Sequence, residues 1–155
     1  MIGVYWGAFD PPTVAHFAII RAALTDIPVK KIVVVVNNHK YKNYVYPLEV
    51  RLKVLKKMLQ EDGVEDAELL FQDEKKKMDY EALKSLFQAP LCAIAGYDAY
   101  VTWLNYSTAL ERKLYEAIAV VPRGNEDPKL FDSNAFLLNI KEKYSHISST
   151  KIRGL

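Results

Sequence analysis

A threonine and a histidine stand close together just after the first apolar run, in the segment from Gly7 to His16, which reads Gly-Ala-Phe-Asp-Pro-Pro-Thr-Val-Ala-His. Thr13 can cap a helix, and the spacing of three residues puts Thr13 and His16 on the same side of its first turn. A helix N-terminus offers free N–H groups and a positive dipole to an anion, and a histidine there can donate to charge that grows on a phosphate. The segment is therefore a candidate site of phosphate chemistry. The alternative is a simple helix cap beside a histidine that packs on the surface or in the core.

A lysine follows the second apolar run, in Asn38-His39-Lys40. Its ammonium is a compact point charge that suits the oxygens of a polyphosphate. We interpret Lys40 as a phosphate ligand, with Lys42 as the second candidate. The alternative is that residues 40–42 form an ordinary solvated loop.

Gly96 and Asp98 follow the fourth apolar run, and Trp103 comes shortly after them. Glycine lets a nucleotide approach the backbone closely, and a carboxylate at the end of a strand can accept hydrogen bonds from ribose hydroxyls. The indole of Trp103 can stack on an aromatic ring of a ligand. The alternatives are that Asp98 is only a helix cap and Trp103 only part of the core.

Hydroxyl side chains and an arginine stand near the end of the sequence, in Ile147-Ser148-Ser149-Thr150-Lys151-Ile152-Arg153. Hydroxyl groups at the start of a helix, with Arg153 one turn further on, would form a cradle for phosphate groups. An ordinary Ser/Thr cap on a terminal helix is the alternative.

The hydrophobic pattern predicts the elements that bring these residues together. Apolar runs rich in valine and isoleucine are typical of strands buried on both faces of a parallel sheet, and they lie at residues 2–6, 32–36, 69–71, 91–95 and 118–121. Helical spacing predicts helices over residues 14–24, 48–59, 80–87 and 136–140. The alternation predicts one domain over residues 1–155: an α/β fold with a Rossmann-like, doubly wound parallel sheet and helices on both faces. Residues 124–132 are polar and contain a proline, so we expect a mobile surface loop there.

Composition argues against several classes of protein. The formal net charge of +2 gives little warrant for a basic face that binds nucleic acid. The longest apolar run, residues 32–36, is far shorter than the ~20 residues of a membrane span, and no secretion signal is visible. The lone cysteine, Cys92, fits a buried thiol in a reducing compartment. We expect a cytoplasmic protein that binds neither nucleic acid nor a membrane.

Together the motifs resemble those of the nucleotidylyltransferase superfamily, and in particular the bacterial nicotinate- or nicotinamide-mononucleotide adenylyltransferases. The segment from Gly7 to His16 is similar to the superfamily signature Gly-x-Phe-Asp-Pro followed by His/Thr-x-Gly/Ala-His. Further matches continue in the family's order across almost the whole chain: His39-Lys40 with Arg51, Gly96-Tyr97-Asp98 with Trp103, Val121-Pro122-Arg123, and the segment from Ile147 to Arg153.

The resemblance implies an adenylyltransferase that moves AMP from ATP to nicotinate or nicotinamide mononucleotide, releases pyrophosphate and serves NAD biosynthesis. It implies that His16 and Thr13 act on the transferring phosphate and Lys40 on the leaving pyrophosphate. The residues implied for ATP are Gly7, Ala8, Phe9, His16, Gly96, Asp98, Ser149, Thr150 and Arg153. Those implied for the acceptor are Ala8, Phe9, Trp103 and Arg123. Magnesium would arrive with ATP rather than at a metal site of the protein, because it usually binds substrate phosphates and few protein groups.

The sequence departs from the family at two places. Trp6 stands where the family usually has a glycine, so we expect a narrowed or reshaped mononucleotide pocket. The sequence stops two residues after Arg153, where family members usually continue through a further helix. The cradle would then be weak, ordered only by ATP, or completed by a second subunit of a homo-oligomer. Two alternatives stay open: an adenylyltransferase for another phosphate-bearing acceptor, such as pantetheine phosphate, and a catalytically weak protein that binds or senses nucleotides.

Overall fold

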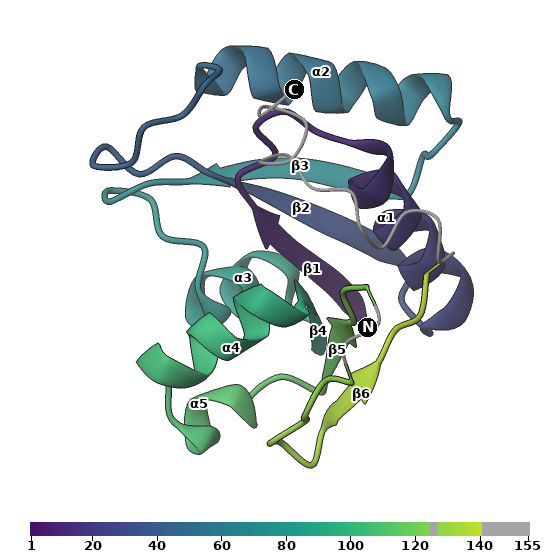
Figure 1. Ribbon diagram of the computed structural model, residues 1–155, viewed down its shortest axis with the longest axis vertical. Coiled ribbons are helices and arrows are strands. Elements are labelled where there is room, and N and C mark those ends of the chain that lie inside the picture. The colour runs from purple at the N-terminus through teal and green to yellow at the C-terminus, as the bar shows by residue number, and fades with distance from the viewer. Residues whose placement is uncertain (125–126, 141–155) are drawn as a thin grey trace.

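A six-stranded parallel sheet forms the centre of the computed structural model, which describes residues 1–124 and 127–140 (Figure 1). The strands are β1 (Ile2–Gly7), β2 (Lys31–Asn37), β3 (Ala67–Gln72), β4 (Leu91–Gly96), β5 (Ala117–Val121) and β6 (Ala135–Leu137). Their order is β3-β2-β1-β4-β5-β6, and every neighbouring pair is parallel. The chain builds outward from β1 to β3 and then crosses to β4 on the other side of β1. The predicted Rossmann-like, doubly wound sheet is confirmed.

Helices cover both faces of this sheet, as predicted (Figure 1). On one face pack α1 (Val14–Asp26) and α2 (Leu48–Glu61), and on the other α3 (Tyr80–Phe87) and α4 (Tyr97–Tyr106), which is followed by the short α5 (Ala109–Arg112). No helix in the described part of the chain has the length and apolar character that crossing a membrane requires.

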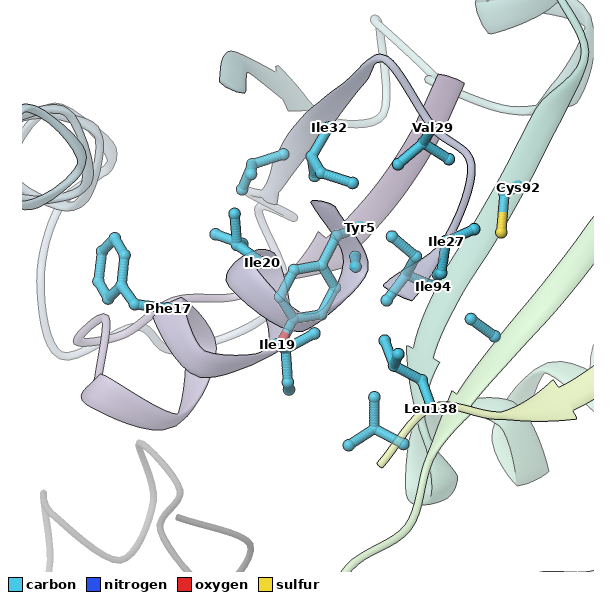
Figure 2. Close-up of a cluster of buried hydrophobic side chains, with 14 of the residues drawn as sticks. Tyr5, Phe17, Ile19, Ile20, Ile27, Val29, Ile32, Cys92, Ile94 and Leu138 are labelled. Atoms are coloured by element: carbon cyan, nitrogen blue, oxygen red, sulfur yellow. The ribbon is translucent and has the colours of Figure 1, made fainter. Parts of the chain in front are cut away.

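The alternation of side chains along the strands divides the interior into two cores. In β2, Ile32, Val34 and Val36 face the core under α1 and α2, whereas Val33 and Val35 face the core under α3 and α4. All five are fully buried, which is why an unbroken apolar run encodes this strand. Figure 2 shows the first of these cores, which contains the thiol of Cys92, buried as predicted.

The helix predicted over residues 136–140 is wrong. Residues 135–137 form the edge strand β6, which pairs with β5 through Ala135, Phe136 and Leu137. The apolar spacing of so short a segment does not distinguish a turn of helix from a strand. Pairing with β5 decides between them, and it depends on a partner that is distant in the sequence.

The surface loop predicted over residues 124–132 is right only in part. Residues 127–131 form neither helix nor strand, but Asp132 is buried. Its carboxylate accepts a hydrogen bond of 2.7 Å from the hydroxyl of Tyr100 and bonds of 2.9 and 3.0 Å from Nε of Arg112. The end of the loop is therefore fastened to α4 and α5, which polar composition alone does not reveal.

Arg51 on α2 joins three segments that surround the carboxyl ends of β1 and β2. Only 1% of this residue is exposed, and its guanidinium donates four hydrogen bonds of 2.6–3.0 Å. The acceptors are the carbonyls of Ala8, Asn37 and Tyr46 and the side-chain oxygen of Asn38. One buried cation thus fixes the turn after β1, the end of β2 and the loop that leads to α2.

Asp10 completes this arrangement from the turn after β1. Its buried carboxylate accepts hydrogen bonds from the backbone N–H groups of Val45 and Tyr46, over 2.6 and 2.8 Å. Burial lowers the pKa of Arg51, and the charge of Asp10 acts against that shift. The two charges therefore stabilise each other and hold the loop of residues 38–46 against the turn after β1.

We expect Arg51→Met to lower the free energy of unfolding by about 3 kcal/mol or more, because it removes the four hydrogen bonds of a buried cation and its attraction to the charge of Asp10. Urea denaturation measures the loss. The matched control is Arg21→Met, which removes an arginine whose side chain is 56% exposed and pairs with Asp62 at the surface. That change should cost about 1 kcal/mol or less. Equal losses for the two variants would contradict the role given to Arg51.

Candidate active site

The predicted site residues gather at the carboxyl ends of the strands, around the switch point between β1 and β4. Gly7 ends β1, Lys40 follows β2, Gly96 ends β4 and Arg123 follows β5. Because β2, β1, β4 and β5 are consecutive in a parallel sheet, these positions share one edge of it. The cradle predicted from Ser149, Thr150 and Arg153 lies outside the described residues and stays a prediction.

His16 is held at the start of α1 by the residue that caps this helix. Thr13 is the N-cap, as predicted, and it is buried. Its backbone N–H donates to Nδ1 of His16 over 2.8 Å, and its hydroxyl oxygen lies 3.3 Å from the same nitrogen. Since Nδ1 accepts a hydrogen bond, the neutral imidazole carries its proton on Nε2. Thr13 thus orients His16 as a donor through Nε2.

Burial keeps the imidazole neutral at physiological pH. Desolvation lowers the pKa of His16 to about 4. The rings of Phe9 and Tyr5 lie beside it, with centroids 4.8 and 6.4 Å from that of the imidazole. The first turn of α1 contains no acidic residue, so no side chain of that turn offsets the positive end of the helix dipole. The start of α1 therefore combines a neutral N–H donor with a field that attracts anions.

The turn after β1 presents its backbone rather than large side chains. A Cβ atom at Gly7 would lie 3.0 Å from the ring of Phe9, which explains the glycine. Phe9 adopts a positive φ of 49° and is buried, so any contact of this residue with a ligand falls to its backbone. Ala8 is exposed. The side chain of Phe9 instead shapes the surroundings of His16.

The loop after β2 carries Lys40 on an anchored backbone. The N–H of Lys40 donates to a carboxylate oxygen of Glu74 over 2.7 Å, and the N–H of His39 donates to the hydroxyl of Tyr44 over 3.0 Å. The imidazole of His39 stacks on the ring of Tyr41, with centroids 5.7 Å apart and planes inclined by 10°. Lys40 itself is exposed. The backbone of Lys40 is thus fixed beside the end of β2, while its side chain is accessible to solvent.

Asp98 and Arg123 form an exposed ion pair that joins the ends of β4 and β5. Asp98 lies in the first turn of α4, and the N-cap of that helix is Gly96. A Cβ atom at Gly96 would meet no other atom within 4 Å, so open space adjoins the end of β4. The sequence places Asp98 at a ribose and Arg123 at the acceptor, and the structure brings the two side chains together.

Trp6 and Trp103 line one cavity of about 330 Å³ beside the ends of β1 and β4, on the face covered by α3 and α4. The indole N–H of Trp6 donates to the carbonyl of Met78 over 3.0 Å, which fixes its orientation. Both indoles pack against the ring of Tyr115, with centroid distances of 6.1 Å for Trp6 and 5.4 Å for Trp103. The side chain that replaces the family's glycine is therefore a wall of this cavity.

Sequence reasoning did not identify Gln72, Asp79 and Tyr115, which also line the cavity. Asp79 has a local explanation as the N-cap of α3, where it accepts a hydrogen bond from the N–H of Ala82. Nothing local shows that the ends of β1 and β3, the start of α4 and the segment before β5 meet at one place. Within residues 1–124 and 127–140, no three His, Cys, Asp or Glu side chains form a group that could hold a metal ion.

Comparison with protein families and with curated proteins finds nucleotidylyltransferases, most of them aligned over nearly the whole chain. The family model described as "Cytidylyltransferase-like" matches residues 4–155. A probable nicotinate-nucleotide adenylyltransferase of Fusobacterium nucleatum is 27% identical over 99% of this chain and 86% of the relative. One of Hydrogenobaculum is 32% identical over 98% of this chain and 83% of the relative. A phosphopantetheine adenylyltransferase of Fusobacterium nucleatum is 44% identical, but over only 38% of this chain and 35% of its own length.

Comparison with solved structures supports the fold. The structure of Plasmodium falciparum nicotinic acid mononucleotide adenylyltransferase complexed with NaAD superimposes with a TM-score of 0.73, covering 99% of this chain and 82% of the other. At 18% identity the match speaks for the shared architecture alone. The resemblance to nucleotidylyltransferases, drawn first from short motifs, is confirmed by the family match over residues 4–155. The chain belongs to the cytidylyltransferase-like family and is an adenylyltransferase enzyme.

Proposed function

We propose that the enzyme transfers the AMP part of ATP to the phosphate of a pyridine mononucleotide, nicotinate or nicotinamide mononucleotide, in NAD biosynthesis. The observation that carries the proposal is the neutral His16 at the start of α1, held by Thr13 at the switch point of the sheet. The names of the relatives that align over nearly the whole chain support the same acceptor class.

The reaction is an in-line displacement at the α-phosphorus of ATP. A phosphate oxygen of the mononucleotide attacks that phosphorus and forms a new P–O–P bridge. The bond from the α-phosphorus to the oxygen that bridges to the β-phosphate breaks, and pyrophosphate leaves with the electron pair. The attacking phosphate is already ionised, so the enzyme has to position the reactants and stabilise charge rather than remove a proton.

The geometry of His16 suits that requirement. Its Nε2–H would donate to a non-bridging oxygen of the α-phosphate, where negative charge grows in the transition state. Because the ring is neutral, it stabilises this charge without delivering a proton to the phosphate. Thr13 is buried and bonded to Nδ1 of the ring, which supports a positioning role rather than direct contact with ATP.

The other predicted residues divide between the ends of the two substrates. Lys40, on its anchored loop, would neutralise the leaving pyrophosphate, and Ser149, Thr150 and Arg153 would hold the β- and γ-phosphates. The open space at Gly96 and the pair of Asp98 with Arg123 suit ribose hydroxyls. Magnesium bound to ATP would supply further charge neutralisation on the phosphates. Asp10 lies in the turn after β1, and both oxygens of its carboxylate accept hydrogen bonds from the loop of residues 38–46.

One specific observation favours a second acceptor. A segment that makes up 38% of this chain is 44% identical to a phosphopantetheine adenylyltransferase. Phosphopantetheine also offers a phosphate to the same α-phosphorus, so the catalytic groups would not differ. A protein that binds ATP without transferring AMP is the third alternative.

An acceptor panel separates these alternatives. The protein is incubated with ATP, magnesium and either nicotinate mononucleotide, nicotinamide mononucleotide or phosphopantetheine, and pyrophosphate release is measured. We expect release with at least one pyridine mononucleotide and none with phosphopantetheine. Release only with phosphopantetheine would overturn the proposed acceptor, and binding of ATP without release in any reaction would overturn the proposed activity.

We expect His16→Ala to lower kcat roughly 100- to 1,000-fold, about 2.7–4 kcal/mol of transition-state stabilisation, because the donor to the α-phosphate is lost. His16→Gln keeps an N–H donor near that position and should lose less. Steady-state pyrophosphate release measures both variants, with circular dichroism as the test of folding. A folded His16→Ala enzyme with full turnover would show that His16 takes no part in catalysis.

The lowered pKa of His16 also predicts how stability depends on pH. The unfolded chain binds a proton near the ordinary pKa of 6.5 and the folded protein only near 4, so the unfolded state binds more protons between these values. Stability should therefore fall as pH decreases from 6.5 towards 4, by about 3 kcal/mol from this residue. Urea denaturation at pH 7 and pH 4.5 should show a smaller difference for His16→Gln than for the unaltered protein. Identical differences would mean that His16 is not buried in its neutral form.

A further inference from the structure

Three aromatic rings from separate parts of the chain wall the cavity beside β1 and β4. Trp6 belongs to β1, Trp103 to α4, and Tyr115 to the segment before β5. The planes of the two indoles are inclined by 85° and 81° to the ring of Tyr115. Both indoles are therefore nearly perpendicular to the tyrosine ring, in an edge-to-face arrangement. At about 330 Å³ the cavity lies in the size range of small-molecule sites.

A carboxylate accompanies these aromatic rings in the lining of the cavity. Asp79 lines the cavity and is exposed, and its side chain is fixed by a hydrogen bond of 3.0 Å from the N–H of Ala82. Its charge reaches into the cavity, because it adds to burial in raising the pKa of Tyr115. None of the described residues that line the cavity is Lys, Arg or His. The formal charge on this lining is therefore negative.

Aromatic walls and a carboxylate favour a ring with net positive charge. Faces of tryptophan and tyrosine attract cations through the ring quadrupole, and Asp79 adds Coulombic attraction. The ring nitrogen of both pyridine mononucleotides is a pyridinium cation. In the acid form the ring also carries a carboxylate, which cancels this charge, whereas the amide form keeps it. The carboxamide N–H groups can also donate to a carboxylate, and an ionised ring carboxylate cannot.

We propose that this cavity selects nicotinamide mononucleotide over nicotinate mononucleotide, and that Trp6 and Asp79 set the preference. The inference rests on the proposed function only in taking the acceptor to be a pyridine mononucleotide. Trp6 lines the cavity from near the end of β1, so its indole can contact the ring of an acceptor that binds there. Asp79 disfavours the acid by placing two like charges close together.

Competing acceptors test the preference directly. With ATP and magnesium saturating, kcat/KM from pyrophosphate release should be about tenfold or more higher for the amide than for the acid. Asp79→Asn keeps a residue that caps α3 and removes the charge, so this ratio should fall about tenfold while the KM for ATP is unchanged. Trp6→Leu should lower kcat/KM for the amide more than for the acid.

Asp73→Asn is the matched control for Asp79→Asn. Asp73 lines the neighbouring cavity with His39 and Glu74, and it does not line the aromatic cavity. The same chemical change at that position should leave the ratio of the two acceptors unaltered. An equal fall of the ratio in both variants would show that general surface charge, and not Asp79, sets the preference.

Binding of ring fragments tests the inference without turnover. Trp6 and Trp103 are the two tryptophans of the chain, and both line the cavity, so tryptophan fluorescence reports on its occupancy. The cation 1-methylnicotinamide should quench this fluorescence at lower concentration than the zwitterion 1-methylnicotinate. If both mononucleotides react and the acid is preferred, the inference fails while the proposed function stands. If neither mononucleotide reacts, the proposed function fails. Whatever the turnover, binding of 1-methylnicotinamide that is equal to or weaker than that of 1-methylnicotinate would overturn the inference.

Discussion

The buried guanidinium of Arg51 is the interaction on which the arrangement of this site depends. A charge inside the protein is stabilising only if its hydrogen bonds are satisfied, and here the acceptors come from three different segments. The cost of burying the charge of Arg51 is offset only when the turn after β1, the end of β2 and the loop after it all take their native positions. Asp10 holds the same loop in place, because its carboxylate accepts hydrogen bonds from the backbone N–H groups of Val45 and Tyr46. Arg51 thus holds in place the segments next to His16 and Lys40 at the carboxyl ends of β1 and β2.

Preorganisation at His16 follows from that framework. The turn after β1 buries Phe9, and Phe9 with Tyr5 gives the imidazole apolar neighbours that keep it neutral. Thr13 selects the tautomer through Nδ1. An uncharged donor at a helix N-terminus is suited to charge that appears only in the transition state. The same sheet edge leaves open space at Gly96 for a nucleotide, and the aromatic cavity adjoins the ends of β1 and β4. In the proposed reaction, one set of elements thereby serves both substrates.

Local patterns in the sequence were sufficient to predict much of the fold and part of the site. The strands buried on both faces could be predicted because such burial leaves unbroken apolar runs like residues 32–36, and the cap of α1 because Thr13 and His16 are three residues apart. Residues 135–137 were misassigned because only pairing with β5 makes them a strand. An arginine on an amphipathic helix is normally exposed, so the sequence could not reveal that Arg51 is buried among four acceptors. The cavity could not be predicted because its walls meet only after the sheet has formed.

In the proposed reaction, His16 acts as a neutral donor through Nε2 at the α-phosphate of ATP. Nitrogen-15 NMR of the histidine side chains measures protonation state and tautomer directly, with His16→Gln identifying the resonances among the three histidines of the chain. At pH 7 we expect an unprotonated Nδ1, a protonated Nε2, and a shift of the Nε2–H resonance when a non-hydrolysable ATP analogue binds. An imidazolium, a proton on Nδ1, or binding of the analogue without any change at Nε2 would contradict this role of His16.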